Sequence, residues 1–287
     1  MRLLGLVGLM WLLALGAIAA GHWLGSPVMG YISDTRPNRQ AILYDYEKQI
    51  GFTLRSSPSM GRLSSNGKEF VTVEYRRAFT NDGDMVPQMR LIGHDGVSLL
   101  NTPTSLMPDS LSWSPEGRRI AYGGTDDQLR VMDLAENSTE VVFSDLPLPL
   151  HLAWSPTSEE MALLTQETLY RLDWQTGTVE PWLSLDGERF ASGLAWSPDG
   201  RWLAYLLSDS EGQWLHLLDT RTDEVTATGN VTTGMTEIQW RDAQNLSIVK
   251  YNAPSVPAEG QNYNTVTRQL TAFALPENYS WGLFWVR

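Results

Sequence analysis

Four histidines are the residues best able to bind a metal or move a proton near neutral pH: His22, His94, His151 and His216. They are scattered, and none forms His-x-His or His-Glu-x-x-His, the spacings that present two ligands to one zinc ion. The chain also has no cysteine, which excludes thiolate catalysis, disulfide bonds and Cys-ligated zinc. We therefore predict no metal site and no catalytic residue.

Three segments resemble functional motifs only in part. Residues 61–68 (GRLSSNGK) have five residues between the glycines where a phosphate-binding loop has four, and Glu69 stands where that loop needs Ser or Thr. Residues 197–202 (SPDGRW) are too short for the Ser-x-Asp-x-Gly-x-x-Trp box of sialidases. Residues 81–84 (NDGD) lack the further ligands of a calcium loop. We interpret all three as turns and predict no cofactor.

The composition indicates a folded, acidic protein. The chain is 42% hydrophobic and 19% charged over 287 residues, so it can bury a large core. Its net charge of −12 repels phosphate backbones, which argues against binding of nucleic acid. Twelve tryptophans suggest a structural position that recurs along the chain.

The N-terminus predicts export. Arg2 is followed by an uncharged apolar run, Leu3 to Ala20. A cleaved signal has an apolar stretch of roughly 7–15 residues and a membrane span needs about 20, so residues 1–20 are a signal peptide or a membrane anchor. The small residues 17–19 could be a cleavage site, but the run is long for a signal, and we favour the anchor. In either case the rest of the chain is periplasmic or extracellular.

A repeat runs through the remainder. Four segments align: LSWSPEGRRIAY, LAWSPTSEEMAL, LAWSPDGRWLAY and IQWRDAQNLSIV, with their tryptophans at Trp113, Trp154, Trp196 and Trp240. The spacings are 41, 42 and 44 residues, and a period of about 40–45 is that of a four-stranded propeller blade. An apolar residue two positions before each Trp has strand periodicity. These tryptophans are therefore predicted to be structural, packed between adjacent blades.

Six blades account for the chain after residue 20. They span roughly 21–55, 58–100, 108–144, 150–184, 191–229 and 235–287, the first two being degenerate copies. Ring closure has two solutions. In the one we favour, residues 268–274 are the third strand of the last blade, residues 279–286 are its fourth, and residues 22–26 supply the inner strand of the first blade. In the other, the C-terminal tail is the inner strand of the first blade, because Leu283-x-Trp285 repeats the apolar-x-Trp pattern.

The turn WSPDG at 196–200 and the strand WLAY at 202–205 resemble TolB-type, WD-repeat-like propellers. The departures from the pattern are Leu63, Arg241-Asp242 and Ala274, the last standing where other blades have Asp. The repeat and the apolar run of residues 3–20 together predict an all-β, six-bladed β-propeller after one N-terminal apolar helix. The resemblance implies a non-catalytic module, often extracytoplasmic, although such propellers serve many functions.

We accordingly expect a protein-interaction or ligand-binding module. Its partner would be a protein or a small extracellular ligand, and it would touch the membrane through the N-terminal helix if that helix is not cleaved. The alternative is a carbohydrate-active or other hydrolytic propeller that uses carboxylates at the central channel. A third possibility is a sensor or an extracytoplasmic arm of a larger assembly.

Two long loops are the expected partner-binding site. They join the second and third strands of blades two and six, at residues 76–87 and 252–264, and long loops on a rigid scaffold often carry recognition. In a closed ring both flank blade one, so we expect them on the same face, forming one cleft. The residues expected to contact the partner are Arg76, Arg77, Phe79, Tyr251 and Tyr263. The opposing interpretation is that both loops are insertions without a role.

Overall fold

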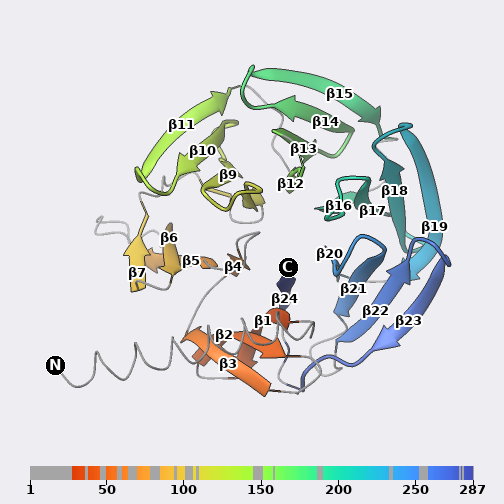
Figure 1. Cartoon of the computed structure of the whole chain (residues 1–287), viewed down its shortest axis with the longest axis horizontal. Helices are drawn as coiled ribbons and strands as arrows, with labels where there is room; N and C mark the ends of the chain where they lie inside the picture. Colours follow the sequence, from red (N-terminus) through yellow and green to blue (C-terminus); the bar gives the residue numbers. More distant parts are fainter. Residues whose placement is uncertain are drawn as a thin grey trace. The chain divides into compact units, whose positions relative to one another are not determined.

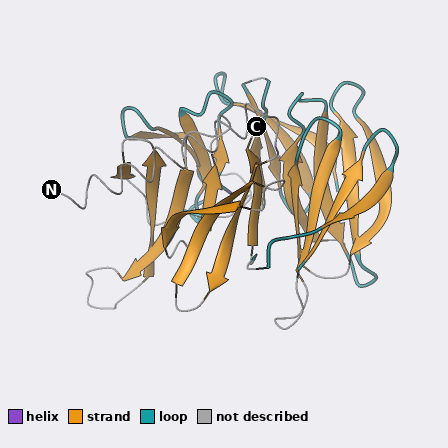
Figure 2. Cartoon of the chain, turned by 60° about the horizontal axis from the view of Figure 1, so that its bottom comes forward, coloured by secondary structure: helices purple, strands orange, loops and turns teal. Residues whose placement is uncertain are grey.

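The structure is a computed structural model. It describes residues 28–35, 38–45, 50–56, 60–63, 70–77, 85–93, 96–100, 106–107, 110–144, 151–157, 159–185, 190–232, 235–251, 258–277, 279 and 281–286. These form strands, turns and loops without an α-helix, and within them no helix is long and apolar enough to cross a membrane (Figure 2). The predicted apolar helix of residues 3–20 lies outside the described residues.

The chain divides into two compact units. The first contains Met1–Leu100 and Asn278–Arg287, and the second contains Asn101–Glu277. The first unit holds two four-stranded antiparallel sheets. One has the order β24 (Trp281–Val286), β1 (Val28–Thr35), β2 (Asn38–Asp45) and β3 (Ile50–Ser56); the other runs from β4 (Met60–Leu63) through β5 (Phe70–Arg77) and β6 (Met85–Gly93) to β7 (Gly96–Leu99).

The second unit, which we call the four-bladed unit, holds four sheets, each built from consecutive antiparallel strands. Their strands are β8 (Ser112–Trp113), β9 (Arg119–Gly123), β10 (Leu129–Asp133) and β11 (Ser138–Phe143); β12 (His151–Trp154), β13 (Glu160–Leu164), β14 (Thr168–Asp173) and β15 (Thr178–Ser184); β16 (Phe190–Trp196), β17 (Trp202–Ser208), β18 (Gln213–Asp219) and β19 (Glu224–Thr232); and β20 (Met235–Trp240), β21 (Asn245–Tyr251), β22 (Glu259–Asn264) and β23 (Gln269–Phe273). Within this unit the first strands β12, β16 and β20 lie innermost and the fourth strands lie outermost (Figure 1).

The repeated tryptophans join neighbouring sheets of the four-bladed unit, as the sequence predicts. All four are buried, with exposed fractions of 9% or less. Trp196 Nε1 donates to the carbonyl oxygen of Ala153 at 3.1 Å, and Trp240 Nε1 donates to that of Ala195 at 2.9 Å. The same bond recurs one sheet further along, so the inner strands β12, β16 and β20 run side by side in the same direction.

The cores of this unit lie between adjacent sheets. In β13, Met161 and Leu163 pack against the sheet that precedes it, while Ala162 and Leu164 pack against the sheet that follows. Alternate side chains of a strand point to opposite faces, and here both faces are apolar because both are covered. This explains why the second strands, such as β17, read as continuous apolar runs.

A side chain at the end of each third strand closes the turn that follows. Asp133, Asp173 and Asp219 each accept main-chain N–H bonds through Oδ1, and Asn264 does the same for Val266 and Thr267 at 3.0 and 2.8 Å. Such side-chain turns favour Asp and Asn. Four residues later each turn has a residue with positive φ: Asn137 (48°), Gly177 (69°), Asp223 (58°) and Arg268 (57°). Asn264 is thus the equivalent of the aspartates, and Ala274 is not.

The ring closure favoured from the sequence is wrong. The third strand of the last sheet is β22, not residues 268–274, and β23 is its fourth strand. The tail β24 instead pairs antiparallel with β1, where Val28 lies opposite Val286 and Met29 opposite Trp285. The alternative solution is therefore confirmed: the last sheet ends at residue 273, and β24, not residues 22–26, is the inner strand of the first sheet. The error arose because β22 (EGQNYN) is polar and lacks apolar alternation.

Candidate functional site

The two ends of the four-bladed unit differ in the number of basic residues that they carry. We call acidic end the end at which β12, β16 and β20 begin; the described acidic residues there are Asp126, Asp127, Glu167, Asp209, Glu211, Glu237 and Glu259, against the basic residues Arg130 and Lys250. We call arginine end the opposite end, where Arg118, Arg119, Arg171, Arg201, Arg221, Arg241 and Arg268 lie among further acidic residues. The acidic end therefore presents few cations, whereas the arginine end presents charges of both signs.

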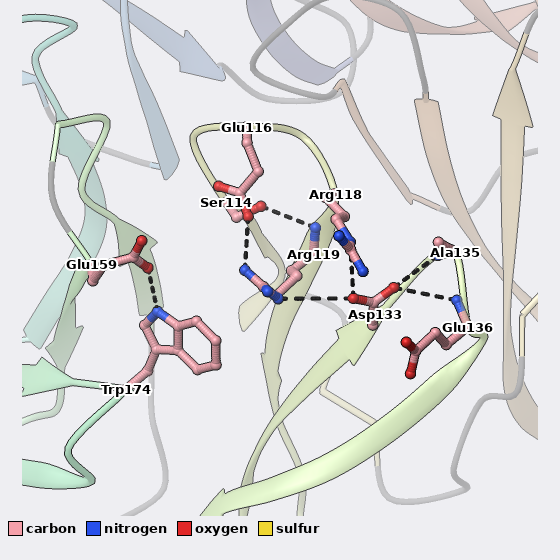
Figure 3. A network of polar contacts seen from close by, with 9 residues as sticks. All are labelled: Ser114, Glu116, Arg118, Arg119, Asp133, Ala135, Glu136, Glu159 and Trp174. Atoms are coloured by element: carbon pink, nitrogen blue, oxygen red, sulfur yellow. Dashed lines mark hydrogen bonds and ion pairs between the residues drawn. The ribbon is translucent and has the colours of Figure 1, made fainter.

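Polar contacts at the arginine end are internal. Asp133 accepts a bond from Arg118 Nε at 3.0 Å and from the main-chain N–H groups of Ala135 and Glu136 at 3.0 and 3.2 Å (Figure 3). Burial raises the pKa of Asp133, but these hydrogen bonds to the charged form outweigh it and hold the pKa below its usual value. The carboxylate is thus fixed as an anion that closes a turn.

Arginines at this end stack on tryptophans, and two of these pairs join different strands or sheets. The Arg119 guanidinium lies 4.8 Å from the ring centre of Trp174, which belongs to the next sheet, and Trp174 Nε1 donates to Glu159 at 2.6 Å (Figure 3). Arg171 lies 3.9 Å from the ring centre of Trp182. Because cation–π pairs of this kind hold adjacent elements together, these arginines have a structural role.

An exposed aromatic ring distinguishes the acidic end. Phe190 begins the inner strand β16 and is 71% exposed, the most exposed large hydrophobic residue among those described. Three residues later, Gly193 has a φ of +59° and marks a shift in the pairing of β16 with β17. Bulges of this kind bend a strand and re-aim its side chains, and they are common beside functional sites.

A buried amide lies beside this strand. Gln213, 6% exposed, begins β18; its Nε2 donates to Ser208 Oγ at 2.8 Å and to Ser192 Oγ at 3.3 Å. The bonds link three neighbouring strands, and Ser208 is also the register partner of Phe190. The Oε1 atom of Gln213 has no hydrogen-bond partner among the described residues. The sheet of β16–β19 thus offers a rigid support beneath the exposed ring.

One acidic residue lies on an inner strand. Glu237 of β20 accepts a hydrogen bond of 2.6 Å from the hydroxyl of Tyr251 at the end of β21. Across the described inner strands β4, β8, β12, β16, β20 and β24, Glu237 is the only Asp or Glu. A hydrolase with two carboxylates would therefore need its second carboxylate from a loop.

Comparisons with known proteins bear on the fold. A profile of the anaphase-promoting complex subunit 4 WD40 domain matches residues 152–243. TolB from Acinetobacter baumannii has a similar structure, with a TM-score of 0.73 at 14% identity over 93% of this chain and 70% of TolB. The chain folds as a β-propeller. The resemblance to TolB-type and WD-repeat-like propellers predicted from the sequence is therefore confirmed.

Two further solved structures are similar in fold. A chain of a nidogen/laminin complex has a TM-score of 0.67 at 8% identity, over 91% of this chain and 98% of that one. An oligogalacturonate lyase in complex with manganese has a TM-score of 0.59 at 12% identity, over 81% of this chain and 70% of the lyase. No curated protein matches the sequence. At these identities the likeness establishes the propeller fold alone.

The residues predicted to contact a partner fall in different environments. Arg76 and Arg77 end β5, and Phe79 lies outside the described residues. Tyr251 is half-buried against Glu237 at the acidic end of the propeller's four-bladed unit. Tyr263 is 6% exposed and packs in the core between two blades, so its ring is not available to a partner, and its choice was wrong because β22 was taken for loop.

The predicted cleft between two loops stays a prediction. Residues 78–84 and 252–257 lie outside the described residues, and the second loop ends before β22 begins at Glu259. Sequence periodicity does not single out Phe190, because a single apolar residue after residues 186–189 forms no repeating pattern. Its exposure is visible only once the bounds of β16 are known.

Two of the histidines can be placed. His216 is 8% exposed and stacks on Tyr205 with ring centres 5.2 Å apart, so it is packed in the blade. Burial in the same place raises the pKa of Tyr205. His151 begins the inner strand β12 at the acidic end. In the part of the chain that the structure describes, no group of His, Asp and Glu is arranged to hold a metal ion.

Proposed function

We propose that this propeller is an exported, non-catalytic module that binds a partner protein at the acidic end of its four-bladed unit. The exposure of Phe190 carries the proposal. A large apolar side chain held in water by a rigid strand is unfavourable unless another surface covers it, and aromatic residues are enriched in interface cores.

The surrounding charge indicates the chemistry of the partner. Asp209 and Glu211 lie in the turn that follows Ser208, the register partner of Phe190. Of the two basic residues that the structure describes at this end, Arg130 is already bonded to Asp126. The surface therefore favours a partner segment that is basic and also carries an apolar side chain to cover Phe190. The attraction between the acidic surface and the basic segment should speed association.

Two observations support a non-catalytic role. The repeated aspartates at the ends of third strands are used to close turns, and the described inner strands contain Glu237 as their one carboxylate. The alternative, a carbohydrate-active propeller, draws on the similarity to an oligogalacturonate lyase. Turnover of oligosaccharides or lactones by the purified chain that is lost in Glu237→Gln would favour that alternative.

Export rests on the N-terminal run of residues 3–20, which we propose to be a signal or an anchor, and on the extracytoplasmic location that the TolB-type resemblance implies. The partner is then a protein, or a ligand, outside the cytoplasm. Arg76 and Arg77, together with Phe79 in the following loop of residues 78–84, form a second proposed contact. Replacement of that loop by an Asn-Gly turn tests the contact separately.

The binding proposal is tested by cross-linking capture from envelope fractions with three chains: wild type, Phe190→Ser and Val225→Ser. Val225 lies on the outer strand β19 and is 39% exposed, so its replacement is a matched control. We expect wild type and Val225→Ser to enrich the same protein, with a yield that falls as salt rises, and Phe190→Ser to lose it. Equal capture by all three chains would place the binding surface elsewhere.

A further inference from the structure

The outer edge of a sheet is a site at which another strand can add. Each sheet ends in an outer strand, and natural proteins protect such edges with charges, proline, bulges or short length. Five of the six outer strands show these devices: β3 has Arg55 and a bulge, β7 has four residues, β11 has Glu140 and a bulge, β15 has Glu180, Pro181 and a bulge, and β19 has Glu224 and two bulges.

Strand β23, which has five residues, lacks a charge, a proline and a bulge. Its sequence QLTAF contains no charge and no proline, and its pairing with β22 runs without a shift from Asn264–Gln269 to Gly260–Phe273. The side chains of residues 269–272 are exposed. On the same hairpin Val266 and Leu270 are 68% and 43% exposed, which is high for apolar residues. This edge is therefore the least protected of the six.

We propose that the edge of β23 pairs with the same edge of a second copy of this chain, antiparallel and about a two-fold axis at Thr271. In this register Thr271 faces Thr271 of the second copy, and Leu270 faces Ala272. Cross-strand Thr–Thr pairs are favourable, and no like charges meet. If β11, β15 or β19 paired with its own copy in the same way, each dimer would bring two glutamates together. Their repulsion disfavours these strands as the contact.

The expected dimer is weak. A pairing of about five residues buries less than the roughly 1,200 Å² of a stable interface. The net charge of −12 on each copy also opposes association. We therefore expect a concentration-dependent dimer that strengthens as salt screens this repulsion. The pairing leaves the acidic end free, so it goes beyond the partner binding proposed above.

Disulfide trapping tests the register. The chain has no cysteine, so Thr271→Cys introduces a single thiol, and two such thiols would lie with their Cβ atoms roughly 4.5–5.5 Å apart across the axis. The full chain is kept in mild detergent because of its apolar N-terminal run. Under mild oxidation we expect rapid covalent dimer from Thr271→Cys, slower dimer from Gln269→Cys, and background from Thr226→Cys on β19. Equal rates for all three would overturn the proposal.

Sedimentation velocity tests the dimer without a covalent bond. Thr271→Lys places two positive charges opposite each other and should weaken the dimer roughly tenfold or more, whereas Thr226→Lys on the outer strand of another blade should leave it unchanged. Circular dichroism checks that both variants fold. The proposal would be overturned if the wild-type chain stayed monomeric at every protein and salt concentration. If such a monomeric chain nevertheless bound a synthetic QLTAF peptide, the edge of β23 would accept a foreign strand and not a second copy of this chain.

Discussion

Trp240 shows what one residue contributes to the contact between blades. Its side chain is fully buried and donates to Ala195 O. We predict that Trp240→Ala lowers the free energy of unfolding by roughly 3–5 kcal/mol, as the loss of a large buried aromatic does. Trp240→Phe keeps an aromatic ring but loses the hydrogen bond to Ala195 O and part of the packing, so it should cost less than Trp240→Ala, about 2 kcal/mol. Urea unfolding followed by tryptophan fluorescence measures both, and similar midpoints for the two variants would contradict the packing role.

Asp133 should make the folding stability depend on pH through a single carboxylate. Because its pKa is lower in the folded chain, it contributes stability above its ordinary pKa of 3.8, and this stability is lost as the pH falls below that value. We predict that Asp133→Asn keeps the turn, because Asn264 closes the equivalent turn in its own blade. The urea concentration at the unfolding midpoint should fall less between neutral and acid pH for Asp133→Asn than for wild type. An unchanged pH profile would show that the carboxylate is not linked to folding.

At the scale of an element, alanine substitutions at two glycines distinguish the cost of backbone strain from the cost of side-chain crowding. Gly193 has a φ of +59°, and an added Cβ would lie 3.2 Å from Ile238 Cγ1 and 3.3 Å from Leu206 Cδ1. Gly177 has a φ of +69° with nothing within 4 Å. Both Ala variants should lose roughly 1–2 kcal/mol to the left-handed backbone. We predict a larger loss for Gly193→Ala, measured by urea unfolding; equal losses would mean that β20 shifts to make room.

The strands themselves show which elements can be predicted from sequence. The inner and second strands of the central blades contain Trp and long apolar runs because they are buried on both faces, and Ser-Pro marks the turn between them. These patterns allow both strands to be predicted from the sequence. Strand β22 contains Gly260 and three amide side chains, so it has no apolar periodicity. Its position in the sheet is set by main-chain hydrogen bonds to β21, which a periodicity pattern does not detect. Its closing residue, Asn264, could have been found by searching for Asn as well as Asp at the ends of third strands.

At the scale of the whole molecule, the proposed export rests on the N-terminal run of residues 3–20. We predict that intact-mass measurement of the protein from its native host finds either Met1 retained, in the membrane fraction, or a new N-terminus near Ala20, in a soluble extracytoplasmic fraction. A chain with Met1 retained in the cytoplasmic fraction would contradict export. The partner site was less predictable than the fold, since exposure of a residue such as Phe190 depends on the three-dimensional arrangement of strands.

The pairing of β24 with β1 sets the order of events during synthesis. About 250 residues separate these two strands, and at roughly 5–20 residues per second the ribosome needs about 12–50 seconds to make that length. The first sheet therefore lacks its inner strand for that whole time, while every other sheet is complete soon after its own residues emerge. The first sheet is thus completed late, when residues 281–286 have been made, and replacement of these residues by a flexible Gly-Ser segment would leave β1 without its inner neighbour.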